Sequence, residues 1–302
     1  MELTPEVFVI DPARYVERLC VFIRESQLAL NRDGILVPFS GGLDSSTVLL
    51  LCLRAVGKDH LTALLMPEKQ GNPQAAGYAR LVAEKYQVNT IVRDLSPILS
   101  SLGSYKFILS ALPFRSVQDK VVQAYMKSTG VNPFLQLMKG KANGQERSGY
   151  AKLISKQRVR VVVEYLVAEE MNYLVAGSAH RSEDLLGLFV KFGVDDVADI
   201  MPLKYLYRSH IVQLARFVGV PAEILSRTPN PDIIPGVSDK YMDILGLPCE
   251  TLDLVLYGLQ HGLDDGNIAG QLSLPVEKVL EIHSLVQQTE HMRTPSLSLT
   301  WE

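Results

Sequence analysis

The chain has 302 residues, of which 47% are hydrophobic and 21% are charged, a balance typical of soluble globular enzymes rather than disordered or fibrous chains. Its formal net charge of −3 gives no sign of nucleic acid or an anionic membrane as the main partner. Three distant cysteines without a Cys-x-x-Cys pair fit a reducing cytoplasm better than a disulfide framework. No apolar run approaches the ~20 residues of a membrane span, and the acidic N-terminus does not resemble a signal peptide.

Helices and strands are predicted to alternate through the first third of the chain. Asp11 and Pro12 are a helix-start pair, since Asp accepts bonds from free N–H groups and Pro fits the first helical turn. The apolar periodicity predicts a helix over 12–30, a strand over 35–39, a helix over 47–56, a strand over 61–66, a helix over 73–86 and a strand over 89–93. This alternation predicts an α/β fold with a doubly wound, mostly parallel sheet and helices on both faces.

The alternation breaks after about residue 95. Apolar residues are dense over 98–114, which we interpret as a helical insertion that is either extra core or a partner surface. The polar, glycine-rich stretch 139–149 is predicted to be a mobile loop. The chain then returns to a helix over 150–171, a strand over 173–176, and helices over 182–189, 207–218, 249–257 and 275–288.

The stretch 226–247 is rich in proline and aspartate. A loop of this length inside a compact enzyme is usually an active-site lid or a binding loop. No internal repeat and no linker is visible, so we expect one domain over 1–302.

The most informative motif is Ser40-Gly-Gly-Leu-Asp-Ser-Ser46, which stands between an apolar strand and an apolar helix. Strand, glycine loop and helix N-terminus together form a phosphate site, because successive backbone N–H groups point at the anion. Neither a Walker A loop nor a Gly-x-Gly dinucleotide fingerprint occurs in the chain. A plain glycine turn capped by Asp44 is the alternative.

The motif resembles the pyrophosphate loop of the N-type ATP pyrophosphatases, which cleave ATP between the α- and β-phosphates. From about Asp11 to Pro295 the order of features is similar to one branch of that superfamily, the ammonia-dependent NAD synthetases. The resemblance implies a homodimer, and ATP and Mg²⁺ for adenylating the nicotinic acid carboxylate of deamido-NAD. Few residues precede Ser40, so free ammonia is the nitrogen source that the resemblance implies.

The resemblance assigns the ATP side of the site residue by residue. It gives magnesium to Asp44 and Glu183, whose hard carboxylate oxygens suit that ion. It places Arg208 where the family has a Lys that contacts ATP, so the charge is kept but the geometry differs. Ser178 and Asn230 stand where the family has Thr. The full set of ATP-binding residues implied is Ser40, Gly41, Gly42, Asp44, Ser45, Ser46, Ser178, Arg208 and Asn230, with Asp44 and Arg208 acting in catalysis.

On the acceptor side the match is looser. The residues that correspond to deamido-NAD contacts are Arg158, Lys191, Asp199, His291 and Met292. Met292 replaces a family Lys, and the segments 154–160 and 191–199 depart from the family patterns. Three hypotheses therefore remain: NAD synthesis, the same adenylation and amidation on a different carboxylate, and nucleotide binding without turnover.

Overall fold

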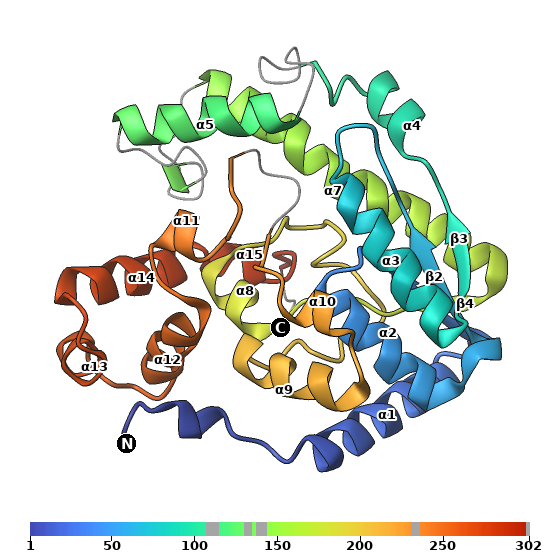
Figure 1. Cartoon of the computed structure of the whole chain (residues 1–302), viewed down its shortest axis with the longest axis horizontal. Helices are drawn as coiled ribbons and strands as arrows, with labels where there is room; N and C mark the ends of the chain where they lie inside the picture. The colour runs from blue at the N-terminus through green and yellow to red at the C-terminus, as the bar shows by residue number, and fades with distance from the viewer. Residues whose placement is uncertain (107–114, 130–134, 137–143, 231–235, 300–302) are drawn as a thin grey trace.

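The computed structural model of the chain describes residues 1–106, 115–129, 135–136, 144–230 and 236–299 (Figure 1). The described residues form one sheet of four parallel strands in the order β3-β2-β1-β4. The strands are β1 (Gly34–Pro38), β2 (Leu61–Leu65), β3 (Asn89–Val92) and β4 (Tyr173–Val175). Parallel strands need crossovers, and helices supply them, so the predicted α/β class is confirmed.

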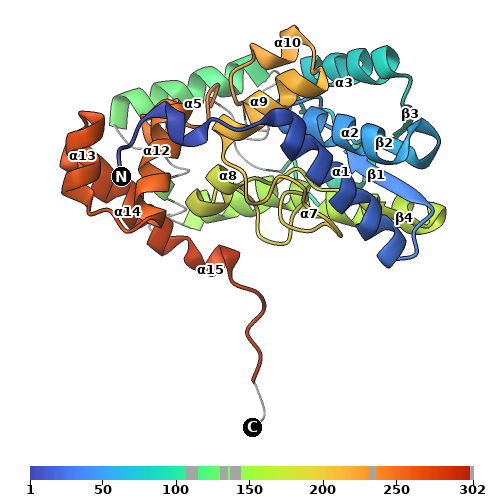
Figure 2. The same cartoon turned by 90° about the horizontal axis from the view of Figure 1, so that it is seen from below.

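Helices make up most of the remaining described structure (Figures 1 and 2). Two short 3₁₀ turns cover Pro5–Phe8 and Lys58–His60. The α-helices are α1 (Pro12–Ala29), α2 (Leu43–Val56), α3 (Pro73–Tyr86), α4 (Ser96–Ser101), α5 (Arg115–Thr129), α7 (Gly144–Met171), α8 (Arg181–Leu186), α9 (Arg208–Val218), α10 (Ala222–Leu225), α11 (Met242–Leu245), α12 (Cys249–Gln260), α13 (Asp265–Leu272), α14 (Val276–Gln288) and α15 (Glu290–Arg293).

The sheet is covered on both faces, as the alternation of strands and helices predicts. Side chains of a strand alternate between its two faces, so neighbouring residues of β1 enter different cores. Ile35 and Val37 pack into a core shared with α1, α2, α3 and α9, whereas Leu36 packs on the other face against Val167 and Ala168 of α7. The carboxyl ends of β1 and β2 consequently lie between two helical layers, where a parallel sheet binds its ligands.

The C-terminal helices form a second core beside the sheet. Helices α12, α13 and α14 pack around Tyr241, Ile244 and other buried residues, and the N-terminal Leu3 and Phe8 join them. In Figure 1 these helices lie to the side of the sheet, next to α8 and α9. Figure 2 shows residues 295–299, which follow α15, leaving the body of the molecule as an extended segment.

Several predicted boundaries were wrong. Helix α2 begins at Leu43 rather than Thr47, so Asp44, Ser45 and Ser46 lie in its first turn. Helix α7 begins at Gly144, which makes the last part of the predicted 139–149 loop helical, while 137–143 lie outside the described residues. The predicted 226–247 loop contains α11, with 231–235 outside the described residues, and α13 was not predicted.

Of the predicted insertion over 98–114, residues 107–114 lie outside the described part of the chain, and α4 with α5 flanks them. The described helices include none that is both long and apolar enough to cross a bilayer.

Candidate functional site

The loop between β1 and α2 is shaped by a glycine with positive φ and by hydrogen bonds to its own hydroxyl groups. Gly41 has φ +73°, a left-handed conformation that glycine adopts without strain, and Gly42 is the N-cap of α2. The Ser40 hydroxyl accepts a hydrogen bond from Gly42 N at 3.3 Å and lies 3.1 Å from the hydroxyl of Ser45. The free N–H groups at the start of a 14-residue helix therefore lie beside the hydroxyls of Ser40 and Ser45.

Gly41→Ala tests this loop geometry. An added Cβ at Gly41 would lie 2.6 Å from Ala79 N and 2.8 Å from Ala75 O, both backbone atoms of α3, so the loop must shift. We expect a loss of about 1 to 3 kcal/mol from the left-handed conformation, with a further loss from the clash, and weaker ATP binding. Urea unfolding and nucleotide titration measure the two effects.

Gly57→Ala is the matched control for that variant. Gly57 also has positive φ, but its added Cβ would meet no atom within 4 Å, and it lies at the far end of α2. Gly57→Ala should therefore lose folding stability from the same unfavourable backbone conformation, but it should leave nucleotide binding unchanged. Equal effects of the two variants on nucleotide binding would contradict the role given to the loop.

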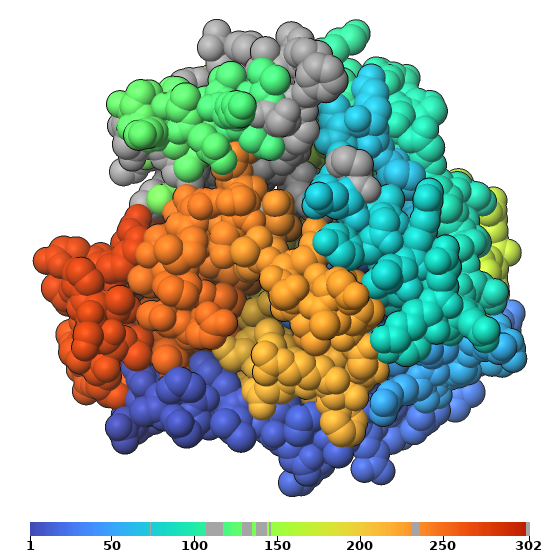
Figure 3. Space-filling model, viewed as in Figure 1, coloured from blue at the N-terminus to red at the C-terminus, as the bar shows by residue number. Residues whose placement is uncertain are grey.

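A pocket of about 970 Å³ opens at the carboxyl ends of β1 and β2. In Figure 3 the orange segment that follows α10 lies against the cyan atoms of α3, and residues of both segments line the pocket. Most of the predicted ATP-side residues line it together: Ser40, Gly42, Asp44, Ser45, Ser178, Glu183, Arg208 and Asn230. Gly41 and Ser46 lie behind this surface, and the Ser46 hydroxyl is fully buried with no hydrogen-bond partner in the part of the chain that the structure describes.

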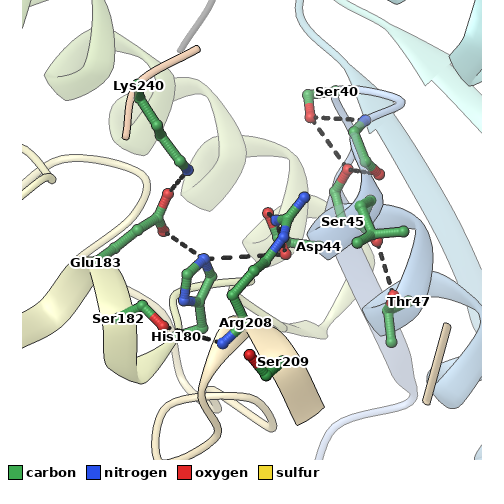
Figure 4. Close-up of polar contacts among 12 residues, drawn as sticks. Ser40, Asp44, Ser45, Thr47, His180, Ser182, Glu183, Arg208, Ser209 and Lys240 are labelled. Atoms are coloured by element: carbon green, nitrogen blue, oxygen red, sulfur yellow. Dashed lines mark hydrogen bonds and ion pairs between the residues drawn. The ribbon is translucent and has the colours of Figure 1, made fainter. Parts of the chain in front are cut away.

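Two carboxylates and two cations meet in the pocket wall (Figure 4). One terminal nitrogen of Arg208 donates to both carboxylate oxygens of Asp44 at 2.5 Å. The ammonium of Lys240 donates to Oε1 of Glu183. His180 is fully buried between the two carboxylates, with Nε2 4.0 Å from Oδ1 of Asp44 and 3.4 Å from Oε2 of Glu183.

The electrostatics of this group favour ionised carboxylates. Burial alone would raise the pKa of Asp44, but the charge of Arg208, with contributions from His180 and Lys240, lowers that pKa to about 2. The pKa of Glu183 is also lowered, because His180 and Lys240 outweigh its burial. Burial lowers the pKa of His180 below its ordinary value, so its ring contributes positive charge at acidic pH, where the carboxylates titrate, and is neutral at neutral pH.

One buried carboxylate outside the pocket aligns the two helices that carry Glu183 and Arg208. Asp253 of α12 is fully buried and accepts hydrogen bonds from the Ser182 hydroxyl at 2.5 Å and from Ser209 N at 2.8 Å. The Ser182 oxygen in turn accepts from Arg208 N at 3.0 Å. The starts of α8 and α9 are thereby joined through α12.

The predicted acceptor-side residues lie elsewhere. Arg158 donates to the carbonyl of Lys191, and the Lys191 ammonium donates to His291 O at 2.6 Å, so these three are linked to one another. Met292 is in α15 beside His291. Asp199 is separate, since its carboxylate accepts from Val175 N at 2.7 Å and from the Tyr165 hydroxyl. None of the five lines the pocket.

The comparisons with known proteins agree over nearly the whole chain. A sequence model of the family described as NAD synthase matches residues 15–128 and 115–296. The chain belongs to the NAD synthase family. Two similar relatives named NH(3)-dependent NAD(+) synthetase come from Coprothermobacter proteolyticus, with 35% identity over 82% of this chain and 84% of that protein, and from Mesorhizobium japonicum, with 32% identity over 92% of each.

Solved structures support the fold of this NAD synthase family member. An NMN synthetase from Francisella tularensis superposes with a TM-score of 0.71 at 20% identity, over 97% of this chain and 100% of that one. An NH3-dependent NAD synthetase from Campylobacter jejuni superposes with a TM-score of 0.67 at 19% identity and the same coverage. At these identities the likeness establishes the α/β fold alone.

The donor set of this NAD synthase family member fits magnesium. Asp44 and Glu183 approach the same imidazole nitrogen of His180 from two elements, so their oxygens converge beside the phosphate loop. Magnesium is commonly bound by one or two carboxylates together with phosphate oxygens. Neither ring nitrogen of His180 has a hydrogen-bond partner among the described residues, so the ring does not occupy the oxygens of either carboxylate with a hydrogen bond.

Lys240 and Asp195 are among the pocket residues that reasoning from sequence did not identify. Lys240 lies in the stretch predicted to be a lid, and a cation among prolines and aspartates was the signal available there. Asp195 lines the pocket instead of Asp199, within a segment one residue longer than the family pattern. Burial and the nearby Glu183 charge raise the pKa of Asp195 to about 6.

Proposed function

We propose that this NAD synthase family member is an ammonia-dependent NAD synthetase, which converts ATP, deamido-NAD and ammonia into NAD, AMP and pyrophosphate. The observation that carries the proposal is the intact Ser40–Ser46 phosphate loop, which shares one pocket with Asp44, Glu183 and Arg208. Relatives at 30% identity and above that span most of the chain carry the same name.

The reaction divides into two substitutions. A carboxylate oxygen of the nicotinic acid group attacks the α-phosphorus of ATP, and the bond from that phosphorus to the bridging oxygen breaks as pyrophosphate leaves. Ammonia then attacks the acyl carbon, the bond to AMP breaks, and the nitrogen loses a proton. Each step builds negative charge on a departing phosphate, which fixed positive groups stabilise.

The chain's own residues suit the first step. The N-terminus of α2 and the hydroxyls of Ser40 and Ser45 would hold the β- and γ-phosphates. Arg208 lies at the same pocket wall and would stabilise charge on the departing pyrophosphate, since its guanidinium stays charged throughout. The ion pair between Asp44 and Arg208 would weaken when the phosphates bind, because Arg208 would then also donate to phosphate oxygens.

Asp44 and Glu183 would hold magnesium, which supplies charge neutralisation to the phosphates when bound. Homodimer assembly, location in the cytoplasm and a single domain over 1–302 belong to the same proposal, on the strength of the family resemblance. So do the acceptor contacts at Arg158, Lys191, Asp199, His291 and Met292, of which three are joined by hydrogen bonds.

A product assay tests the proposed function. The purified chain is incubated with ATP, magnesium, ammonium and deamido-NAD, and the nucleotides are separated. Equimolar NAD and AMP are expected. ADP and orthophosphate as products would contradict the loop assignment, because they require cleavage at the γ-phosphate.

The same assay with nicotinate mononucleotide in place of deamido-NAD tests the acceptor. We expect less AMP with this smaller acid. Turnover with the mononucleotide but not with deamido-NAD would contradict NAD synthesis. It would leave the proposed adenylation of a carboxylate intact.

A further inference from the structure

The two carboxylates assigned to magnesium each already hold a cation of the protein. Arg208 pairs with Asp44, and Lys240 pairs with Glu183 (Figure 4). Both cations line the nucleotide pocket and are almost fully buried, each with 8% of its surface exposed. A buried cation that loses its partner is costly unless another anion takes the partner's place.

The backbone around Lys240 is fixed by several hydrogen bonds. Lys240 N donates to Pro229 O at 2.9 Å, and Asp239 caps the turn by accepting from Tyr241 N at 2.8 Å. The carboxylate of Asp243 accepts from Ser238 N and Asp239 N. The side chain of Lys240, rather than its loop, is therefore the part free to change partner.

Ligand binding changes what surrounds that ammonium. Magnesium binds carboxylate oxygens strongly, so an ion at Glu183 competes directly with Lys240 for the same oxygens. The polyphosphate arrives in the same pocket, against the loop that Ser40 and Ser45 line. Lysine has a flexible stem and three donors, which lets one side chain serve either anion.

We propose that Lys240 is a further nucleotide-binding residue: it is the counter-ion of Glu183 before ligands bind, and it binds a phosphate oxygen once magnesium takes Glu183. This inference rests on the proposed function, because it requires ATP and magnesium in this pocket. Asp195, which also lies within electrostatic reach of Lys240, is the competing acceptor for the ammonium. A polyphosphate carries several charges and is the stronger competitor.

Binding without turnover tests the proposal. The nonhydrolysable α,β-methylene ATP is titrated calorimetrically into the full chain with magnesium, and manganese is titrated separately without nucleotide. Lys240→Met should weaken the nucleotide about tenfold or more, the loss of one charge-assisted bond. The same variant should bind manganese several-fold more tightly, because no ammonium has to be displaced.

Two variants serve as controls. Lys240→Arg should keep nucleotide affinity close to that of the wild type. Lys204→Met removes a lysine that pairs with Asp184 at 2.6 Å outside the pocket, and should leave both affinities unchanged. Opposite shifts for nucleotide and metal in Lys240→Met alone would support the proposal, since a purely structural lysine would not separate them.

Other outcomes overturn it. If Lys240→Met binds the nucleotide as tightly as the wild type does, Lys240 is only the counter-ion of Glu183 in the unliganded protein. The proposed function would be unaffected by that result. Failure of the wild type to bind the analogue with magnesium would overturn both.

Should Lys240→Met fail to fold, Glu183→Gln in EDTA decides the matter. The freed lysine should tighten metal-free nucleotide binding several-fold, and adding Lys240→Met should remove that gain. Unchanged or weaker binding in Glu183→Gln, or a gain that persists in the double variant, would contradict the proposal.

Discussion

Asp44→Asn is expected to lower the rate of AMP formation at least about a hundredfold, because it removes a carboxylate charge that the proposed function assigns to magnesium binding and frees Arg208 from its ion pair. Amide and carboxylate have the same shape, so the loop and α2 should stay folded. The measurement is AMP release at saturating ATP, magnesium and deamido-NAD. Turnover close to that of the wild type would remove Asp44 from the mechanism.

The same variant should also be less stable, which the sequence alone did not suggest. Arg208 is 8% exposed and would lose its anionic partner, at a cost of up to about 3 kcal/mol, since Asn keeps one oxygen that the guanidinium can bond. Adding Arg208→Gln should recover most of the stability and none of the activity. If the double variant is as unstable as Asp44→Asn, the broken ion pair between Asp44 and Arg208 is not the cause of the lost folding stability.

Glu164→Gln is expected to reduce strongly the fall in stability with rising pH. Glu164 of α7 is fully buried, and neither of its carboxyl oxygens has a hydrogen-bond partner among the described residues. Burial, with the nearby Asp195 charge, raises its pKa to about 9. The folded protein therefore keeps the proton, while the unfolded chain releases it near the ordinary value of 4.5.

The sign follows from that difference. Below pH 4 both states are protonated and the group has no effect, whereas above it each pH unit favours the unfolded chain by about 1.4 kcal/mol until the folded pKa is reached. Between pH 5 and pH 7 the wild type should lose about 3 kcal/mol relative to Glu164→Gln. Urea unfolding at each pH measures this slope, and an unchanged slope in the variant would contradict the buried proton.

Glu169→Gln is the matched control on the same helix. Glu169 is paired with Arg32 at 2.9 Å near the surface, and that hydrogen bond lowers its pKa. Its replacement should leave the slope between pH 5 and pH 7 unchanged, because both states are ionised there.

The sequence predicted that Ser40 to Ser46, Glu183 and Arg208 lie together, and the structure brings most of them to one pocket, because much of this set is local. Ser40 to Ser46 is one continuous motif, and the parallel sheet brings Glu183 and Arg208 to the same edge from later strands and helices. The start of α2 was placed too late because its first turn is polar, and hydrophobic periodicity begins only at Val48. Polar residues in the first turn of α2 face the pocket, so hydrophobic periodicity does not mark the part of the helix that lies in the candidate site.

Other pocket residues could not be predicted from the sequence, for a different reason. Lys240 and Asp195 enter the pocket from segments without regular periodicity, and their partners lie far away in sequence. Helix α7 carries apolar, charged and small residues around its circumference, since it contacts the sheet on one side and the pocket on another. Long-range contacts of this kind leave no local pattern to read.

The buried carboxylate of Asp253 has a consequence for how the enzyme tolerates change. It does not line the pocket, yet it fixes the separation of Glu183 and Arg208 through Ser182 and Ser209. Displacements in the packing around α12 are therefore transmitted to the spacing of Glu183 and Arg208. Displacement of the C-terminal helices should reduce the rate of the proposed adenylyl transfer first, before any loss of substrate binding or of folding.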